Sequence, residues 1–160
     1  MLAGGPALSI YFDLLYFKQL FLDPLYHLLT LPIGLFLAML AFRAAAAGGK
    51  ELARRGRQKR STPRLETDSL VTTGIYSHMR HPMLFGLALL PLALAFILGS
   101  PTFILVVAPL ETLFVIVMVL TFEELECRKK FGAAYDDYSQ RVPAVCFKKE
   151  CLSELFSKKE

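Results

Sequence analysis

Three long apolar stretches, at residues 25–47, 83–98 and 101–122, constrain the fold more than any other feature of the sequence. The first is apolar except for His27 and Arg43, the second contains no charged residue, and the third contains only Glu111. A transmembrane helix needs about 20 consecutive, mainly apolar residues. The first and third stretches meet this length, and the second meets it if its helix begins slightly earlier. The sequence therefore predicts an all-α integral membrane protein.

A fourth apolar segment, at residues 7–22, is marginal as a membrane span because it contains Asp13 and Lys18. It is interpreted either as a span packed against other helices or as an interfacial helix. It has no basic n-region and no small-residue cleavage site, so a removed signal peptide is not expected. The chain, residues 1–160, is therefore predicted to be a single membrane domain with three to four transmembrane helices.

The distribution of Lys and Arg predicts the orientation. Both residue types are concentrated in the loop at 48–81 and in the C-terminal segment at 123–160, and the turn at 99–101 has neither. Because Lys and Arg are enriched on the cytoplasmic side of membranes, the loop and the C-terminal segment are expected to face the cytoplasm. Helices at 82–98 and 101–122 then form a helical hairpin whose two cytoplasmic ends lie side by side.

Polar groups are crowded at both cytoplasmic ends of this hairpin. The stretch at 74–86 reads GIYSHMRHPMLFG and places Arg80 and His81 directly before one helix, and the other helix ends at Glu123 and Glu124. Each group alone is interpreted as an interfacial anchor or a solvated helix end. The hairpin brings the two clusters to one membrane surface, where together they form a candidate site.

Glu111 stands apart because it lies near the middle of an apolar stretch. An ionisable group inside a membrane is costly, and it is usually functional or paired with another group. Pro109 lies two residues before it and removes a backbone hydrogen bond. A functional role and a structural role both remain open for Glu111.

The net charge of +4 and the three cysteines narrow the range of functions. The basic charge matches the predicted topology and the anionic lipid headgroups at a membrane surface, and no aromatic-interleaved basic module indicates a nucleic-acid partner.

The three cysteines, Cys127, Cys146 and Cys151, form no Cys-x-x-Cys pair. Neither a metal site nor a disulfide framework is therefore expected.

Two segments carry a longer ordered pattern: LVTTGIYSHMRHPMLFG at 70–86 and FEELECRKKFGAAYDDYSQRVP at 122–143, with the hairpin between them. This pattern resembles the isoprenylcysteine carboxyl methyltransferase-like family of integral membrane methyltransferases, which shares its motif with bacterial phospholipid methyltransferases. The resemblance covers about residues 33–147. The matching positions are Leu70, Val71, Thr72, Gly74, Tyr76, Arg80, His81, Pro82, Gly86, Glu123, Glu124, Phe131, Gly132, Tyr135, Tyr138, Val142 and Pro143.

The resemblance implies a site for S-adenosylmethionine between the cytoplasmic helix ends and the C-terminal segment, with S-adenosylhomocysteine as the product. It implies a lipophilic acceptor that enters from the membrane. Neither a metal nor a nucleic acid is expected from the cysteine and charge patterns, and no protein partner is implied. Arg80 and Glu123 are the candidate catalytic residues. The candidate cofactor-binding residues are Asp68, Ser69, Leu70, Val71, Tyr76, His81, Pro82, Met83, Leu84 and Glu124.

Two departures from the family pattern bear on the acceptor. Leu84 stands where the family usually has Tyr, and the turn at 119–122 lacks the Arg expected to hold a substrate carboxylate. The acceptor is therefore left open between an isoprenylcysteine carboxyl group, a phospholipid and a small hydrophobic molecule. The alternatives to an enzyme are a catalytically degenerate membrane scaffold and a lipid-binding anchor that acts through the basic loop at 48–68.

Overall fold

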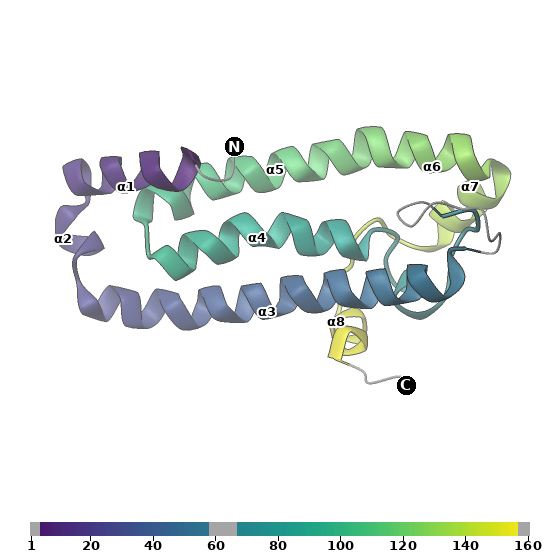
Figure 1. Cartoon of the computed structure of the whole chain (residues 1–160), viewed down its shortest axis with the longest axis horizontal. Helices are drawn as coiled ribbons and strands as arrows, with labels where there is room; N and C mark the ends of the chain where they lie inside the picture. The colour runs from purple at the N-terminus through teal and green to yellow at the C-terminus, as the bar shows by residue number, and fades with distance from the viewer. Residues whose placement is uncertain (1–3, 58–66, 157–160) are drawn as a thin grey trace. The chain divides into compact units, whose positions relative to one another are not determined.

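The computed structural model describes residues 4–57 and 67–156. Every regular element within these two ranges is a helix, which confirms the predicted all-α class (Figure 1). The elements in chain order are α1 (Gly4–Tyr16), α2 (Lys18–Phe21), α3 (Pro24–Arg55), η1 (Gly74–Ser77), α4 (Pro82–Leu98), η2 (Phe103–Val107), α5 (Ala108–Met118), η3 (Val119–Glu123), α6 (Glu124–Phe131), α7 (Ala133–Arg141) and α8 (Lys149–Phe156).

The chain divides into two compact units. The first unit contains residues 1–41 and 87–116, and the second contains residues 42–86 and 117–160. The candidate site residues lie in the second unit, and most of the uninterrupted apolar sequence lies in the first. The single-domain interpretation of the chain stays a prediction.

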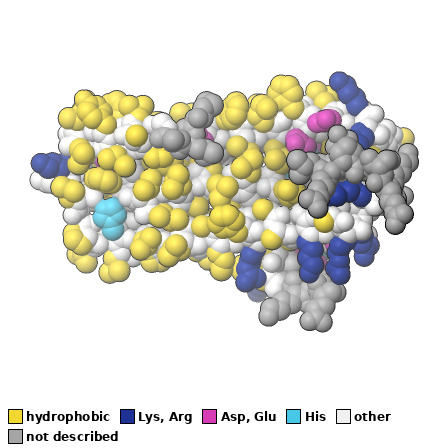
Figure 2. All heavy atoms as spheres, viewed as in Figure 1, with side chains coloured by type: hydrophobic (Ala, Val, Ile, Leu, Met, Phe, Trp, Pro, Cys, Tyr) yellow, Lys and Arg dark blue, Asp and Glu magenta, His cyan; other side chains and the backbone are white. Residues whose placement is uncertain are grey.

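Among the described residues, two helical segments are long and apolar enough to cross a membrane. These are α3 and the continuous helical run Phe103–Phe131, which contains η2, α5, η3 and α6. α4 is equally apolar but has only 17 residues. Large hydrophobic side chains are exposed along these helices, and Figure 2 shows such side chains over most of the visible surface. This surface suits a lipid environment, and the predicted number of three to four spans stays a prediction.

Both long helices continue past their predicted ends. α3 ends at Arg55 rather than at residue 47, and the later run ends at Phe131 rather than at residue 122. Most of the added residues are good helix formers such as Glu, Lys, Arg and Leu, and Arg55 Nε lies 3.2 Å from Glu51 Oε1 one turn earlier. An apolar pattern marks only the part of a helix inside the membrane, so it could not reveal these extensions.

The segment at residues 7–22 does not form one continuous helix. α1 and α2 are interrupted at Phe17, and the 13 residues of α1 span about 20 Å, less than the hydrocarbon core of about 30 Å. Asp13 is fully buried within the first unit. Its carboxylate accepts hydrogen bonds from the Ser100 hydroxyl and, at 2.8 Å, from the Thr102 N–H. Asp13 therefore satisfies backbone and side-chain donors at the start of a helix.

Glu111 lies beside α1 in the same unit. A Cβ atom on Gly5 would lie 3.4 Å from Glu111 Oε1 and 3.1 Å from the Val107 side chain, so α1 packs closely against this part of the helical run. The N-terminus of a helix carries a partial positive charge that favours a nearby carboxylate. Of the two roles left open for Glu111, this placement favours the structural one.

Candidate functional site

Arg80, His81 and Glu124 form a buried polar cluster in the second unit. Arg80 Nε and NH2 donate to Glu124 Oε1 at 3.0 and 2.6 Å, and His81 Nε2 lies 2.8 Å from the same oxygen. The three side chains are only 11%, 6% and 10% exposed. The structure thus brings together the two polar clusters that the hairpin was predicted to unite.

Arg80 also fastens the segment after α7 to this cluster. Its NH1 group donates to the carbonyl oxygens of Ser139 at 2.9 Å and Val142 at 2.6 Å. The backbone N–H groups of Arg80 and His81 donate to Pro143 and Ala144 at 3.0 and 3.1 Å. Because one guanidinium joins a carboxylate and two carbonyl groups, Arg80 acts as a structural clamp.

The electrostatic setting keeps this clamp charged. Burial lowers the pKa of Arg80, but the hydrogen bond and the negative charge of Glu124 outweigh that effect, so the pKa stands above its ordinary value. Arg80 therefore remains a cation at physiological pH. An arginine committed to these partners has little freedom to follow a reacting group.

Two tyrosines of α7 complete the inner part of the site. The Tyr138 hydroxyl donates to the Tyr76 carbonyl at 2.5 Å, and the Tyr135 hydroxyl lies 3.5 Å from His81 Nε2. The chain can turn from α6 into α7 because Gly132 adopts a φ of +55°. Burial raises the pKa values of Tyr76, Tyr135 and Tyr138, so their hydroxyls stay neutral at physiological pH.

These elements line an open cavity of about 320 Å³ in the second unit. Its wall combines the end of α3, the segment before η1, the start of α4 and one side of η3, α6 and α7. The lining residues are Leu52, Thr67, Ser69, Leu70, Val71, Tyr76, Arg80, His81, Met83, Leu84, Glu123, Cys127, Phe131, Tyr135 and Tyr138.

Most of the predicted site residues line this cavity. Both candidate catalytic residues, Arg80 and Glu123, are in the wall. So are seven of the candidate cofactor-binding residues: Ser69, Leu70, Val71, Tyr76, His81, Met83 and Leu84. The structure therefore brings together residues that lie more than forty positions apart in the sequence.

Three predicted cofactor-binding residues are not among the described lining residues: Asp68, Pro82 and Glu124. Glu124 lies behind the wall, where it holds Arg80 and His81. Pro82 is buried at the first position of α4, and the Asp68 N–H donates to the Gly56 carbonyl at 2.8 Å. Their direct contact with a cofactor stays a prediction.

The cavity wall also contains residues that were not predicted to bind the cofactor. Cys127 and Phe131 follow Glu123 at intervals of four residues, so all three lie on one face of the helical run. Helical periodicity applied past residue 122 would have found them. Tyr135 and Tyr138 belonged to the matching motif but had no predicted role. Leu52 had no signal because α3 was expected to end earlier, and Thr67 had none because it lies outside the matching motif, which begins at Leu70.

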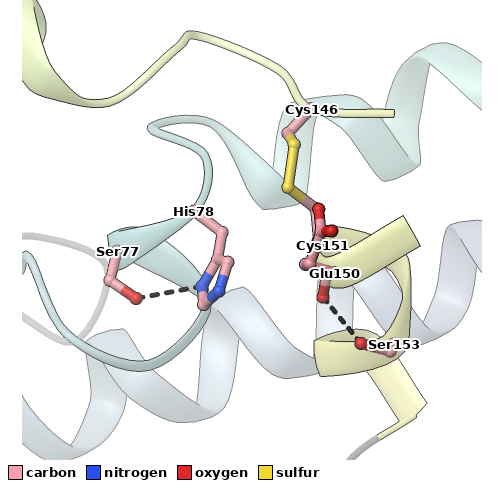
Figure 3. Close-up of a disulfide and its surroundings, with 6 residues drawn as sticks. All are labelled: Ser77, His78, Cys146, Glu150, Cys151 and Ser153. Atoms are coloured by element: carbon pink, nitrogen blue, oxygen red, sulfur yellow. Dashed lines mark hydrogen bonds between the residues drawn. A yellow bond between two sulfur atoms is a disulfide. The ribbon is translucent and has the colours of Figure 1, made fainter. Parts of the chain in front are cut away.

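The C-terminal segment contains a disulfide between Cys146 and Cys151, with their Cα atoms 6.1 Å apart (Figure 3). The expectation that the cysteines form no disulfide was therefore wrong. The Cys-x-x-Cys pattern did not predict this disulfide, because the two cysteines are five residues apart. α8 starts between them and turns Cys151 back toward Cys146. α8 packs against η1, which contributes Tyr76 to the cavity.

The disulfide bears on the predicted orientation. Disulfides persist mainly in oxidising compartments, whereas the distribution of Lys and Arg predicts a cytoplasmic C-terminal segment. The cytoplasmic orientation stays a prediction.

Within residues 4–57 and 67–156, no group of three or more His, Cys, Asp or Glu side chains is arranged to hold a metal ion.

Comparison with protein families decides the wider classification. The family model for phospholipid methyltransferases matches residues 28–134, which is more than half of the chain. The chain belongs to the phospholipid methyltransferase family. The family consists of membrane methyltransferases that act on lipid-type substrates and generally use S-adenosylmethionine. No curated protein and no solved structure matches the chain.

The match confirms the resemblance to integral membrane methyltransferases. In this phospholipid methyltransferase family member, the matched region contains most of α3, the Arg80–His81 pair and the Glu123–Glu124 pair. It ends before Tyr135. The matched region therefore does not include the α7 tyrosines, the contacts of Arg80 with Ser139 and Val142, or the disulfide-linked segment.

Proposed function

We propose that this protein transfers a methyl group from S-adenosylmethionine to a lipophilic acceptor at the membrane. The observation that carries the proposal is the cavity of about 320 Å³ whose wall contains Arg80, His81 and Glu123 in a member of the phospholipid methyltransferase family. Small-molecule sites in proteins are commonly about 300–1,000 Å³, lined mainly by apolar groups with a few polar ones. The cavity meets both criteria.

The lining residues fit the chemical character of this cofactor. When bound, S-adenosylmethionine supplies a methyl group activated on a sulfonium, together with an ammonium and a carboxylate. Glu123 provides a carboxylate in the wall for a cationic group. Leu70, Val71, Met83 and Leu84 provide apolar surface for an adenosyl group. The donor set therefore suits a molecule that is cationic at one end and flat and weakly polar at the other.

The other proposed task of the side chains around the cavity is to position the methyl donor and the acceptor. Methyl transfer is an in-line displacement that disperses charge, so holding donor and acceptor in line supplies most of the rate. Glu124 fixes the orientations of Arg80 and His81, and Tyr138 fixes the position of the Tyr76 backbone. Neutral tyrosine hydroxyls add hydrogen-bond donors without adding charge. The cluster thus maintains the shape of the cavity wall.

The helical turn before Glu123 indicates which chemical class of methyl acceptor the site favours. Val119 is buried there, whereas Leu120, Thr121 and Phe122 are exposed, and none of these four side chains is a cation. An acceptor carboxylate would find no charge-assisted partner at this turn. This favours an acceptor without a free carboxylate, such as an amine-bearing phospholipid, over an isoprenylcysteine.

Transfer of labelled methyl groups tests the proposal. The purified protein, reconstituted in proteoliposomes, is incubated with methyl-labelled S-adenosylmethionine and one of three acceptors: phosphatidylethanolamine, a farnesylated cysteine peptide or a small hydrophobic amine. Label is expected in the phosphatidylethanolamine fraction. Label only in the farnesylated peptide would reassign the acceptor. No label in any fraction, with the protein folded, would favour the degenerate scaffold.

A further inference from the structure

The positive charge of the chain is confined almost entirely to the second unit. Of the 18 Lys and Arg residues, the first unit contains only Lys18, together with three of the 14 acidic residues. One cation against three acids gives the first unit a formal charge of −2, and since the whole chain carries +4, the second unit carries +6. Figure 2 shows Lys and Arg gathered mainly in one region of the visible surface.

Along α3, exposed apolar side chains give way to exposed cations at one point. Large hydrophobic side chains are exposed from Leu25 to Phe42, which is 67% exposed. Exposed cations follow at Arg43, Lys50 and Arg54, at intervals of seven and four residues that place them on one face of the helix. Such a change marks the depth at which a helix passes from hydrocarbon into lipid headgroups.

The later helical run shows the same change. Its exposed large hydrophobic side chains continue to Phe122 and Leu125, and exposed cations follow at Arg128, Lys129 and Lys130. In both helices, therefore, exposed apolar side chains are followed by exposed cations toward the C-terminal end. The cations at the end of each helix are suited to contact with phosphate groups at the membrane surface.

At the end of α3, three of the cations line a second cavity. Arg54, Arg55 and Arg57 surround a space of about 370 Å³ together with Ser69, Thr72 and Thr73. Its described lining residues include no acidic side chain. Beside it, Glu51 accepts a hydrogen bond from the Thr73 hydroxyl at 2.7 Å and pairs with Arg55, which ties the segment before η1 to α3.

We propose that this cavity binds the phosphate group of an anionic lipid headgroup. Guanidinium groups present planar, forked donors that match phosphate oxygens, and hydroxyl groups add neutral donors. Arg54 lies on the same face of α3 as Arg43 and Lys50, the cations that follow the exposed apolar side chains, and this continuity favours a lipid over a soluble anion. The site is distinct from the proposed methyl donor site and does not rest on it.

The two cavities share part of their walls. Ser69, Leu70 and Val71 line both the arginine-lined cavity and the cavity proposed for the methyl donor. A headgroup held by Arg54 and Arg57 would therefore keep the proposed donor cavity close to the headgroup layer. The expected consequence is that anionic lipid anchors this part of the chain at the depth where a lipid acceptor is presented.

Lipid binding in detergent tests the proposal without any activity measurement. The full chain in a neutral detergent is titrated with short-chain phosphatidylglycerol, with phosphatidylcholine of the same chain length and with inorganic phosphate, and thermal stabilisation is followed. Phosphatidylglycerol is expected to bind saturably and about tenfold more tightly than phosphatidylcholine. Inorganic phosphate alone is expected to stabilise the protein far less.

Matched variants separate a built site from net charge. Arg54→Gln with Arg57→Gln is expected to weaken phosphatidylglycerol binding about tenfold and to change S-adenosylmethionine affinity by less than about twofold. Lys18→Gln with Arg141→Gln removes the same charge elsewhere and is expected to leave lipid binding unchanged. Arg54→Lys with Arg57→Lys, which keeps the charge, is expected to bind at an intermediate level and guards against misfolding.

Three results would overturn the proposal. The first is equal binding of the anionic and neutral lipids. The second is equal loss of lipid binding in the two double glutamine variants, which would indicate a net-charge effect. The third is inorganic phosphate binding as tightly as phosphatidylglycerol, which would identify a site for a free anion.

Discussion

Arg80 and Glu124 lie 44 residues apart in the sequence, yet Arg80 NH2 lies 2.6 Å from Glu124 Oε1 in a setting where both side chains are nearly buried. The same arginine reaches two backbone carbonyl groups after α7. This single side chain therefore connects the start of α4, the start of α6 and the C-terminal segment. The sequence motif suggested a catalytic role for Arg80, and its contacts indicate a positioning role.

Arg80→Lys tests the clamp because it keeps the charge and loses the fork. A lysine cannot serve Glu124, Ser139 and Val142 at once, so amide hydrogen exchange at residues 139–146 is expected to accelerate. S-adenosylmethionine affinity is expected to fall about tenfold. Arg141→Lys is the control, because Arg141 is exposed and pairs with Asp137 on the surface. Unchanged exchange in Arg80→Lys would remove the clamp role.

Glu124→Gln is expected to reduce S-adenosylmethionine affinity by more than about tenfold. Removing the negative charge leaves the Arg80 cation buried without its partner and releases His81, so the wall loses its shape. Calorimetry in detergent measures the change. Glu126→Gln is a matched control, because Glu126 is exposed on the same helix. His81→Ala is expected to have a similar effect, and equal affinities in all of these proteins would exclude the cluster from the site.

Cys127→Ser is expected to leave methyl transfer unchanged. The Cys127 side chain lines the cavity, but a sulfonium donor already carries an activated methyl group, so no enzyme thiol is needed. Serine is of similar size, and the wall should keep its shape. Loss of turnover in a folded Cys127→Ser protein would show that the thiol takes part in the chemistry.

Removing the disulfide is expected to release α8. An eight-residue helix is not stable alone, so its docking on η1 depends on the Cys146–Cys151 link and on burial of Leu155. The short loop between the cysteines predicts a loss of about 2 kcal/mol on cutting the link. Limited proteolysis of Cys146→Ser with Cys151→Ser should cleave within residues 149–156. Unchanged resistance to the protease would contradict this account.

Two glycines of α3 are expected to respond to alanine in opposite directions. A Cβ atom on Gly34 would lie 2.6 Å from the Ile97 nitrogen and 2.9 Å from the Ala93 oxygen, whereas a Cβ on Gly49 has no neighbour within 4 Å. Gly34→Ala should destabilise the fold by about 1–3 kcal/mol. Gly49→Ala should stabilise it by about 0.5–1 kcal/mol. Thermal unfolding in detergent compares them, and equal shifts would contradict the packing of α3 against α4.

The apolar pattern predicted the helical class because it records which residues face lipid. It could not show that α3 continues to Arg55, since polar residues outside the membrane carry no apolar signal. Consequently it could not place Leu52 in the cavity or Arg54 and Arg57 around a second one. The same limit applied at the other helix, where the continuation to Phe131 brings Cys127 into the wall.

The motif predicted most of the cavity wall but not the roles of its charged residues. The matching pattern named Arg80, His81 and Glu124, and the structure brings all three together. Which of them faces the cavity and which lies behind it depends on side-chain geometry that spacing does not encode. The contacts of Arg80 with Ser139 and Val142 involve backbone carbonyl groups, which carry no residue-type signal. The Cys146–Cys151 pair likewise depends on where α8 begins.

The most direct test of the central claim is calorimetric binding of S-adenosylmethionine to the detergent-purified protein, combined with alkylation of Cys127. Cys127 is the one cysteine of the chain outside the disulfide, and it lines the proposed donor cavity. S-adenosylmethionine is expected to bind at micromolar concentration, to slow maleimide labelling of Cys127, and to lose this binding in Glu124→Gln. No binding by a folded sample, or binding that leaves the labelling rate of Cys127 unchanged, would contradict this claim.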